Sequence, residues 1–276
     1  MAEPQDVRSQ AAIAAALVVA SREGMRVVEP RVVGRGSNRI IWLSPTPIVA
    51  RVMTGTAVLH DDPRAWLARE IDLGVFLAGT DASVVPPASA IDPGPHISGG
   101  LWMSLWEHVQ VIPADVSARE LGESLRVLYD AMAGYEGSLA PQSAVLDEID
   151  WLIAALADHA GGDEALLAER DRLARLLSHG DDEGQPLHGD ASLSNLLSTS
   201  AGPRWNDFED VCRGSSAWDV VGLVDDAREH HGDAFAADVL AAYSRDIDPG
   251  LVQVVRDTHA LYGTLWRRYR SRSSQP

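Results

Sequence analysis

The sequence contains no lysine, and all 23 of its basic side chains are arginine. A phosphate-binding loop of the G-x-x-x-x-G-K-[ST] type is therefore excluded, because its lysine is the group that reaches the phosphates. A Schiff-base lysine and a Ser-x-x-Lys nucleophile pair are excluded for the same reason. A site that binds phosphate in this protein must take its cation from elsewhere.

Cysteine is almost as scarce, because Cys212 is the only one. An intrachain disulfide and a cysteine-rich zinc site are therefore excluded. Positive charge is in deficit too: 23 basic and 40 acidic side chains give a formal charge of −17. This balance argues against non-specific binding of nucleic acid, which requires positive charge against phosphate. It fits either an ordinary solvated acidic surface or a cationic small-molecule partner.

Long apolar runs are missing as well. The apolar run at residues 11–20 is half as long as the ~20 residues that a membrane-spanning helix needs. The six residues that open the chain, Met-Ala-Glu-Pro-Gln-Asp, contain no basic region of the kind that begins a signal peptide. We therefore expect an N-terminal helix at this run, no membrane partner and a cytoplasmic location.

The composition, 46% hydrophobic and 23% charged, is typical of a globular protein. Up to about residue 110, short β-like runs predominate, with one helix among them. That helix is predicted to begin where Asp62 precedes Pro63 and to end at Gly79. Strands are expected at residues 27–33, 40–43, 47–53, 84–85 and 101–111.

After residue 110 the apolar residues recur at helical spacing. Helices are expected at residues 116–134, 144–159, 164–179, 217–230, 234–244 and 251–268. A loop at 180–194 leads to a hairpin of residues 195–198 and 204–208. We therefore predict an α+β, two-lobed protein kinase-like fold. Residues 1–105 form a lobe with a small antiparallel sheet and a helix, 106–110 a hinge, and 111–276 a mainly helical lobe.

The most specific local pattern is His-Gly-Asp-Ala-Ser-Leu-Ser-Asn at residues 188–195, which matches H-x-D-x-x-x-x-N. Transfer of a phosphoryl group to a hydroxyl requires a carboxylate that orients the hydroxyl and accepts its proton, and Asp190 fits that role. It also requires a neutral amide oxygen that reaches a metal ion, and Asn195 fits that role. His188 is expected to hold the loop rather than to react.

A second carboxylate-rich segment, Asn-Asp-Phe-Glu-Asp at residues 206–210, follows the expected hairpin. An aspartate at this point in a kinase binds the Mg²⁺ ions that bridge the nucleotide phosphates. Asp207 has the matching order and distance from Asn195. Clustered carboxylates repel one another, and a divalent cation compensates that repulsion.

The residues from His188 to Asp219 resemble the aminoglycoside phosphotransferase/choline kinase superfamily. That family has an H-G-D-x-x-x-x-N loop, then I-D-[WF], then R-G-[DN]-P-x-x-D-[LVI] leading into a helix. Arg213, Gly214, Ala217 and Asp219 fall in register, whereas Ser-Ser at 215–216 replaces the usual Asp-Pro. The resemblance is strong over residues 186–222 and architectural elsewhere. It implies an ATP- or GTP-dependent enzyme with Mg²⁺ as cofactor.

The family pattern also implies a cation on the third strand and a glutamate on the following helix. Arg51 is the candidate cation, because alternation along the strand places it opposite the face shared by Ile48, Ala50 and Val52. Its guanidinium would hold the donor phosphates in a bidentate fork. Glu70 is the expected ion-pair partner. An exposed cation at the edge of the sheet is the alternative for Arg51.

Two further segments complete the predicted nucleotide site. Ser37 lies in the glycine-containing run 34–38, where backbone N–H groups could approach phosphates, although an ordinary turn is an equal alternative. The resemblance implies that backbone groups of Trp106, Glu107 and His108, between the lobes, meet the nucleobase.

The residues that would bind the acceptor have the weakest sequence signal. Asp225, Asp226 and Glu229 are candidates for binding an amino-bearing acceptor, with a solvated acidic face as the alternative. The function predicted is transfer of the γ-phosphoryl group to a hydroxyl of a small molecule, first of all an aminoglycoside-type or other cationic antibiotic. The alternatives are a metabolic kinase for choline, an amino alcohol or a sugar, and a pseudokinase that binds without turnover. A protein kinase fits less well, because the segment from Asp207 to Asp219 is too short for an activation loop. No pattern indicates an oligomeric state.

Overall fold

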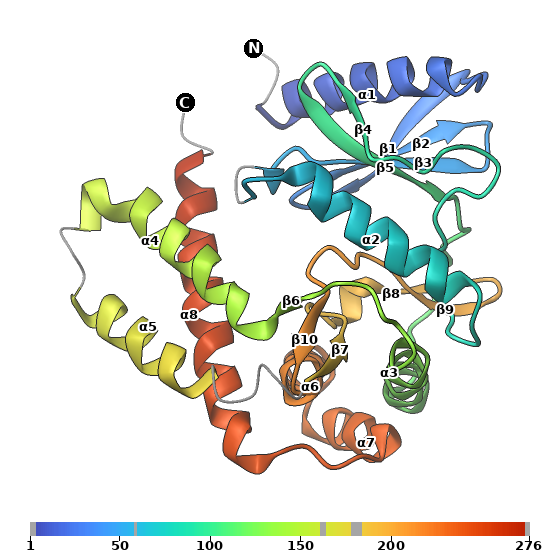
Figure 1. The fold of residues 1–276 in the computed structure, drawn as a ribbon. Coiled ribbons are helices and arrows are strands. Elements are labelled where there is room, and N and C mark those ends of the chain that lie inside the picture. Colours follow the sequence, from blue (N-terminus) through green and yellow to red (C-terminus); the bar gives the residue numbers. More distant parts are fainter. Residues whose placement is uncertain (1–3, 58–59, 161–163, 178–183, 274–276) are drawn as a thin grey trace. The chain divides into compact units, whose positions relative to one another are not determined.

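The computed structural model describes residues 4–57, 60–160, 164–177 and 184–273 (Figure 1). It is an α+β fold, as predicted, whose contacts divide the chain into two compact units. Unit 1 comprises Met1–Ala114 with Leu197–Glu209, and unit 2 comprises Asp115–Leu196 with Asp210–Pro276. The segment 197–209 thus groups with the N-terminal part of the chain. The two lobes and the hinge expected at 106–110 stay a prediction.

Unit 1 is built on an antiparallel five-stranded sheet with the strand order β1-β2-β3-β5-β4. Its strands are β1 (Glu29–Arg35), β2 (Arg39–Ser44), β3 (Ile48–Val52), β4 (His96–Ser98) and β5 (Leu101–Glu107). The register pairs Ile40 with Arg51 and Arg51 with Ser104. Directly paired residues of antiparallel strands share a face, so these three side chains lie on one side of the sheet.

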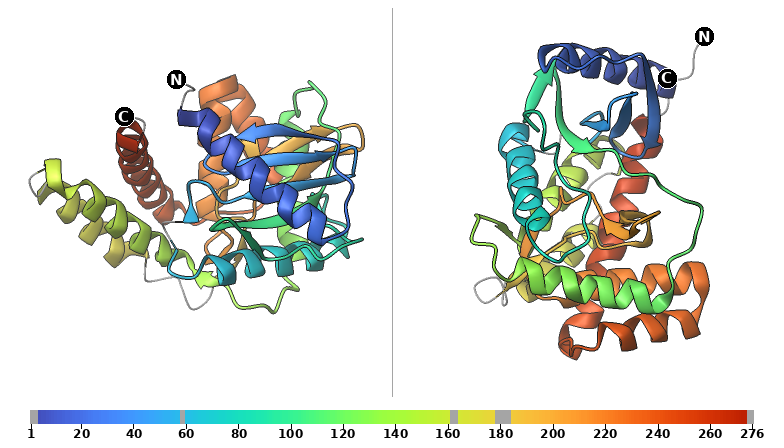
Figure 2. Two further views of the ribbon diagram at one scale, coloured as in Figure 1. Left: turned by 90° about the horizontal axis from the view of Figure 1, so that it is seen from above. Right: turned by 90° about the vertical axis from the view of Figure 1, so that its right-hand side faces the viewer.

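The opposite face of the sheet carries the apolar core of unit 1. Ile41, Ala50 and Leu105 are fully buried there against helix α1 (Pro4–Arg22). Helix α1 contributes mainly small residues to this contact, and it runs across the strands in Figure 2. Because α1 covers this face, Arg51 points to the other one, which confirms the orientation predicted from strand alternation.

Helix α2 (Pro63–Ala78) begins at the predicted position. The Asp62 carboxylate accepts a hydrogen bond from the Ala65 backbone N–H at 3.0 Å, and Pro63 occupies the first turn. The helix packs closely at Gly74, where a Cβ would lie 3.0 Å from the Trp106 ring. Helix α2 thereby delivers the buried Glu70 to the face of the sheet that carries Arg51.

A two-stranded hairpin of β8 (Leu196–Thr199) and β9 (Gly202–Trp205) accounts for the later segment of unit 1. Trp205 is 1% exposed, and its backbone exchanges hydrogen bonds with Ser83 and Val85. A hairpin was predicted here, but its second strand spans Gly202–Trp205 rather than 204–208, so the turn comes earlier than expected. The hairpin leads directly into the Asp207 segment and so fixes where that segment begins.

Unit 2 is mainly helical. Its helices are α3 (Ala118–Met132), α4 (Val145–Ala160), α5 (Glu164–Leu177), α6 (Ala217–His231), α7 (Asp233–Tyr243) and α8 (Pro249–Ser273). Helices α4, α5 and α6 contact α8, and α3 lies beside α7. A Cβ at Gly122 would lie 2.3 Å from the Val239 carbonyl oxygen, so glycine permits the close packing of α3 on α7.

A small three-stranded sheet, in the order β6-β10-β7, lies within unit 2. Its strands are β6 (Ala140–Pro141), β7 (Gln185–Leu187) and β10 (Cys212–Gly214). The single-turn helices η2 (Gln142–Ala144) and η3 (Leu193–Asn195) follow β6 and precede β8. Strand β7 ends at Leu187, directly before His188, and so positions the loop that begins there.

Several predicted boundaries were wrong. Strand β5 ends at Glu107 rather than 111, and 84–85 forms only a bridge from Val84 to Trp205. Strand β7 lies within the loop expected at 180–194, and strand β4 was not predicted, because three-residue strands depend on pairing with β10 and β5 rather than on local pattern. Helix α8 continues to Ser273. The last two residues of the helix predicted at 164–179 and the first four of the loop predicted at 180–194 lie outside the described residues. Among the described helices, none is long and apolar enough to cross a membrane.

Candidate active site

The loop after β7, residues 188–195, is held from behind by one buried carboxylate. Asp219, in the first turn of α6, is 1% exposed. It accepts hydrogen bonds from the backbone N–H groups of His188 at 2.7 Å and of Gly189 at 3.0 Å. The Tyr129 hydroxyl donates to it at 2.8 Å. Burial and the adjacent Asp219 charge raise the pKa of Tyr129 well above its ordinary value, so this hydroxyl keeps its proton.

Gly189 is required by the conformation of this loop. Its φ of +91° lies in a region that favours glycine, and a Cβ there would lie 1.8 Å from the Asp210 carbonyl oxygen. The Trp218 indole N–H donates to the Gly189 carbonyl at 2.8 Å. The glycine of the His-Gly-Asp motif therefore allows the loop to pack directly on the Asp210 backbone.

Asp190 is exposed, and its neighbours set its orientation. The Asn195 side-chain N–H₂ donates to the Asp190 carbonyl at 2.8 Å and to its carboxylate at 2.9 Å. The Asp190 backbone N–H in turn donates to His188 Nδ1 at 3.3 Å. His188 is fully buried, and its ring contacts the backbone of its own loop; a hydrogen bond from the ring to backbone near Asp207, which would hold the loop, stays a prediction. The arrangement presents a carboxylate at a fixed position on the surface of unit 2.

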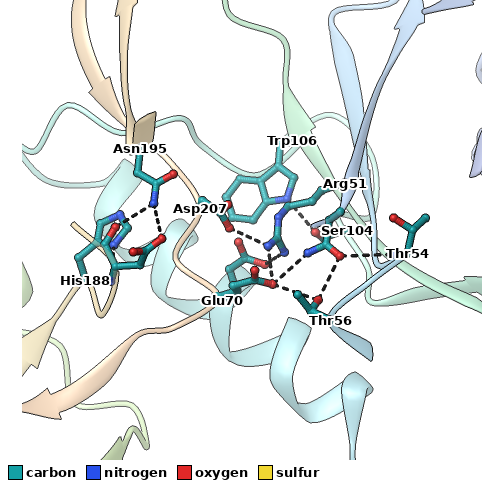
Figure 3. A network of polar contacts seen from close by, with 12 residues as sticks. Arg51, Thr54, Thr56, Glu70, Ser104, Trp106, His188, Asn195 and Asp207 are labelled. Atoms are coloured by element: carbon teal, nitrogen blue, oxygen red, sulfur yellow. Dashed lines mark hydrogen bonds and ion pairs between the residues drawn. The ribbon is translucent and has the colours of Figure 1, made fainter. Parts of the chain in front are cut away.

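In unit 1, Arg51 is the centre of a buried ion-pair cluster (Figure 3). Its Nη1 lies 3.2 Å from the Glu70 carboxylate, as predicted. Its Nη2 lies 2.6 Å from Asp207 and 2.5 Å from Glu209. The arginine is 4% exposed, which excludes the alternative of a solvated edge-strand cation. Arg51 thus belongs to a cluster of one cation and three carboxylates rather than to the single ion pair that was expected. The sequence did not indicate that Glu209 takes part in it.

Burial and charge compete in this cluster. Desolvation acts to lower the pKa of Arg51, but the carboxylates of Asp207, Glu209 and Glu70 together raise it well above its ordinary value. Burial raises the pKa of Glu70 to about 8, against the opposing attraction of Arg51. Burial also raises the pKa of Glu209. Removing carboxylates from water is thus costly here, and Arg51 is the group that offsets the cost.

The segment that carries Asp207 has an unusual backbone. Asp207 has a φ of +65°, which is uncommon for a residue other than glycine, and Phe208 beside it is fully buried. The buried ring fixes the segment, while 36% of the Asp207 side chain stays exposed. Such left-handed aspartates are typical of functional sites.

The donor chemistry of Asp207 and Asn195 fits a hard divalent cation. Both side chains carry oxygen, which Mg²⁺ prefers, and it is the amide nitrogen of Asn195 that donates to the Asp190 carboxylate. Within the part of the chain that the structure describes, no group of three or more His, Cys, Asp or Glu side chains could hold a metal. Metal binding by Asp207, in unit 1, and by Asn195, in unit 2, stays a prediction.

The predicted nucleobase residues lie at the end of β5. The Trp106 indole donates to the Ser104 hydroxyl at 2.8 Å, and the Glu107 carboxylate accepts from the Ser89 hydroxyl at 3.0 Å. The His108 ring stacks on Trp42, with centroids 4.4 Å apart. Burial lowers the pKa of His108. Trp42 was missed from the sequence, although its position two residues after Ile40 on β2 places it on the face of Arg51.

The predicted phosphate loop and acceptor residues have mixed surroundings. Ser37 is exposed, and contact with phosphate stays a prediction for it. Asp225 is paired with Arg256 at 2.7 Å and with Arg228, and the Asp226 carboxylate accepts from the Leu193 backbone N–H at 2.8 Å. Glu229 is exposed. That the three acidic residues contact an acceptor likewise stays a prediction. Two of them, Asp225 and Asp226, already bind other residues of unit 2.

A comparison with models of protein families identifies the family of this chain. A model of the phosphotransferase enzyme family (APH) matches residues 4–254. The chain belongs to the phosphotransferase enzyme family. It is accordingly a small-molecule phosphotransferase of the kinase type, which confirms the predicted superfamily and enzyme class.

Solved structures of low sequence identity share the fold of this phosphotransferase. Amicoumacin kinase in complex with AMP-PNP and Ca²⁺ is 14% identical, with a TM-score of 0.68 over 91% of this chain and 84% of the other. The gentamicin complex of APH(2″)-IIa is 15% identical, with a TM-score of 0.65 over 94% and 92%. A choline kinase from Streptococcus pneumoniae is 13% identical, with a TM-score of 0.66 over 95% and 92%. No curated protein sequence matches the chain.

Proposed function

We propose that this phosphotransferase moves the γ-phosphoryl group of ATP or GTP to a hydroxyl of a cationic small molecule, with an aminoglycoside-type or similar antibiotic as the first candidate. The observation that carries the proposal is the oriented Asp190 carboxylate, held by Asn195 in a loop fixed on Asp219. The gentamicin and amicoumacin kinase complexes among the similar structures support an antibiotic acceptor. A cytoplasmic location is part of the proposal, because ATP and GTP are available there as donors.

Asp190 would orient the acceptor hydroxyl and accept its proton as the oxygen attacks phosphorus. Its exposure on unit 2 leaves it accessible to an acceptor, and the two hydrogen bonds from Asn195 keep it in one orientation. Preorganisation of this kind is the main contribution of protein groups to phosphoryl transfer, since the transition state needs little covalent help.

Asp207 and Asn195 are the residues that would hold Mg²⁺. The bound cation would neutralise negative charge on the donor phosphates. Arg51 would contact the same phosphates with its guanidinium, in the place of the usual lysine, while Glu70 keeps it in position. Since Arg51 now contacts Asp207 at 2.6 Å, Arg51 and the metal would share that carboxylate.

A metabolic kinase is the second candidate, and the structural similarity to choline kinase favours it. Release of ADP or GDP in the presence of aminoglycosides, cyclic peptide antibiotics, choline, amino alcohols and sugars separates the two. Antibiotic-dependent release supports the first candidate. Release only with choline, an amino alcohol or a sugar supports the second. Nucleotide binding without release for any acceptor supports a pseudokinase and contradicts both.

The role of Asp190 is tested by Asp190→Ala in the same assay. Acceptor-dependent release is expected to disappear while Mg·nucleotide binding persists, because Asp190 acts on the acceptor. Asp233→Asn is a matched control, since Asp233 is an exposed carboxylate of unit 2 that pairs with Arg228. Unchanged turnover in Asp190→Ala contradicts the mechanism.

A further inference from the structure

Glu209 stands where several segments of unit 1 converge. It follows Asp207 by two residues, and only 12% of its side chain is exposed. Its carboxylate oxygen Oε2 contacts three side chains from separate segments (Figure 3 shows the surrounding network). Because three side chains contact this one oxygen, it forms a junction between segments of the fold. The Asp207 side chain, by contrast, is 36% exposed.

The first partner is Asn38, in the glycine-containing loop between β1 and β2. Its amide nitrogen donates to Glu209 at 3.1 Å, and the residue is 6% exposed. Its amide oxygen accepts from the Thr54 backbone N–H at 3.2 Å and from the Thr56 hydroxyl at 3.0 Å. Asn38 therefore ties its loop both to the segment after β3 and to Glu209. Two hydrogen bonds accepted by the amide oxygen and one donated by the amide nitrogen fix this orientation of the Asn38 amide.

The second partner is Arg51, whose Nη2 lies 2.5 Å from the same Glu209 oxygen. Glu70 binds Nη1 on the other arm, so two buried carboxylates fix the plane of the guanidinium. One oxygen of Glu209 thus joins the cation that is proposed to hold the donor phosphates to the loop 34–38. Removal of Glu209 would break the link between the two, although Arg51 would keep Glu70 and Asp207 as partners and Asn38 would keep Thr54 and Thr56.

We propose that Glu209 is a positioning residue that couples the loop 34–38 to Arg51, so that both meet the donor phosphates in one fixed arrangement. This inference rests on the proposed nucleotide-dependent function. It assigns a role to the third position of the Asp-Phe-Glu sequence, which the proposed mechanism leaves unused. Glu209 acts through Arg51 and Asn38, without a contact of its own to the phosphates.

The test is a double-mutant cycle on nucleotide affinity. Binding of AMP-PNP and GMP-PNP is measured by calorimetry for the wild type, Glu209→Ala, Asn38→Ala and the double variant, with Mg²⁺ and again with EDTA. Each single change is expected to weaken binding about tenfold, and the double variant is expected to lose no more than about tenfold, because both changes break one junction. Glu209→Gln keeps an oxygen for Asn38 and Thr56 and is expected to recover binding to within about threefold of the wild type.

Glu29→Gln is the control, because Glu29 is an exposed carboxylate of unit 1 that pairs with Arg31. Thermal unfolding checks that each variant is folded, and if Glu209→Ala is not, the cycle is run with Glu209→Leu, which also removes both carboxylate oxygens. Unchanged affinity in the single variants, or losses that add in the double variant, would overturn the coupling. A loss that occurs with Mg²⁺ but is absent with EDTA would also overturn it, since it would make Glu209 a metal ligand.

The two proposals fail in different ways. Absence of nucleotide binding in the wild type contradicts the proposed function itself. Nucleotide binding that is strong in the wild type and equally strong in the variants contradicts only the role of Glu209.

Discussion

Arg51→Met is the most informative single change for the buried cluster, because methionine keeps most of the side-chain length and removes the charge. It leaves the carboxylates of Glu70, Glu209 and Asp207 without their shared cation. Breaking a buried ion pair from one side costs about 3–5 kcal/mol. Asp207 is 36% exposed, so its part is discounted for solvent screening. We expect a loss of about 4 kcal/mol in the free energy of unfolding at pH 7.5, a large part of a typical total.

The pH dependence of the free energy of unfolding follows from Glu70. Burial raises its pKa from 4.5 to about 8, so the folded state holds the proton more tightly than the unfolded state. The stability that this group contributes is therefore complete below about pH 4.5 and is lost as the pH rises through 8. The interval of about 3.5 pH units corresponds to an upper limit of about 5 kcal/mol. Arg51 opposes the rise in this pKa, so its removal extends the fall in stability to higher pH.

Urea unfolding at pH 6.5, 7.5 and 8.5, followed by tryptophan fluorescence, measures both effects. Arg51→Met is expected to lie closest to the wild type at pH 6.5 and furthest from it at pH 8.5, because only the wild type begins to ionise Glu70 near pH 8. Adding Glu70→Gln to Arg51→Met should flatten the pH dependence, because the titrating group is gone. Unfolding free energies for Arg51→Met within about 0.5 kcal/mol of the wild type at all three values would refute the reasoning.

Three further outcomes are expected. Asp219→Ala should lower the free energy of unfolding by about 3 kcal/mol in urea denaturation, since it strands buried N–H groups and the Tyr129 hydroxyl; a loss below about 1 kcal/mol would contradict this. Gly189→Ala should lower kcat at least tenfold while circular dichroism stays native, because a Cβ would collide with the Asp210 carbonyl; normal kcat would show that the loop adapts. Trp42→Ala should raise the nucleotide KM about threefold to tenfold at unchanged kcat, because its stack with His108 borders the predicted nucleobase position; an unchanged KM would place the base elsewhere.

The features that follow from local chemistry could be predicted from the sequence. The spacing of His188, Asp190 and Asn195 is set by a single loop, so the motif alone indicates which side chains meet. The orientation of Arg51 follows from alternation along one strand, and the start of α2 follows from its Asp-Pro cap. In each case the determining contacts lie within a few residues of one another.

The contacts that were missed join segments far apart in the chain. Asn38 and Glu209 are 171 positions apart, and neither residue type predicts the other. The stack of Trp42 on His108 depends on the pairing of β2 with β3 and of β3 with β5, which sequence periodicity does not specify. The three-residue strands β4 and β7 exist only because a partner strand is present. Long-range pairing is thus what the sequence leaves open.

The central claim is that Asp190 is the group that acts on the acceptor hydroxyl. Single-turnover transfer from Mg·ATP or Mg·GTP to an acceptor from the panel tests it most directly, with Asp190→Asn compared against Asp233→Asn. We expect the transfer rate of Asp190→Asn to fall about 10²–10⁴-fold, with the nucleotide affinity within about twofold of the wild type and Asp233→Asn unaffected. Transfer by Asp190→Asn at the rate of the wild type would contradict it.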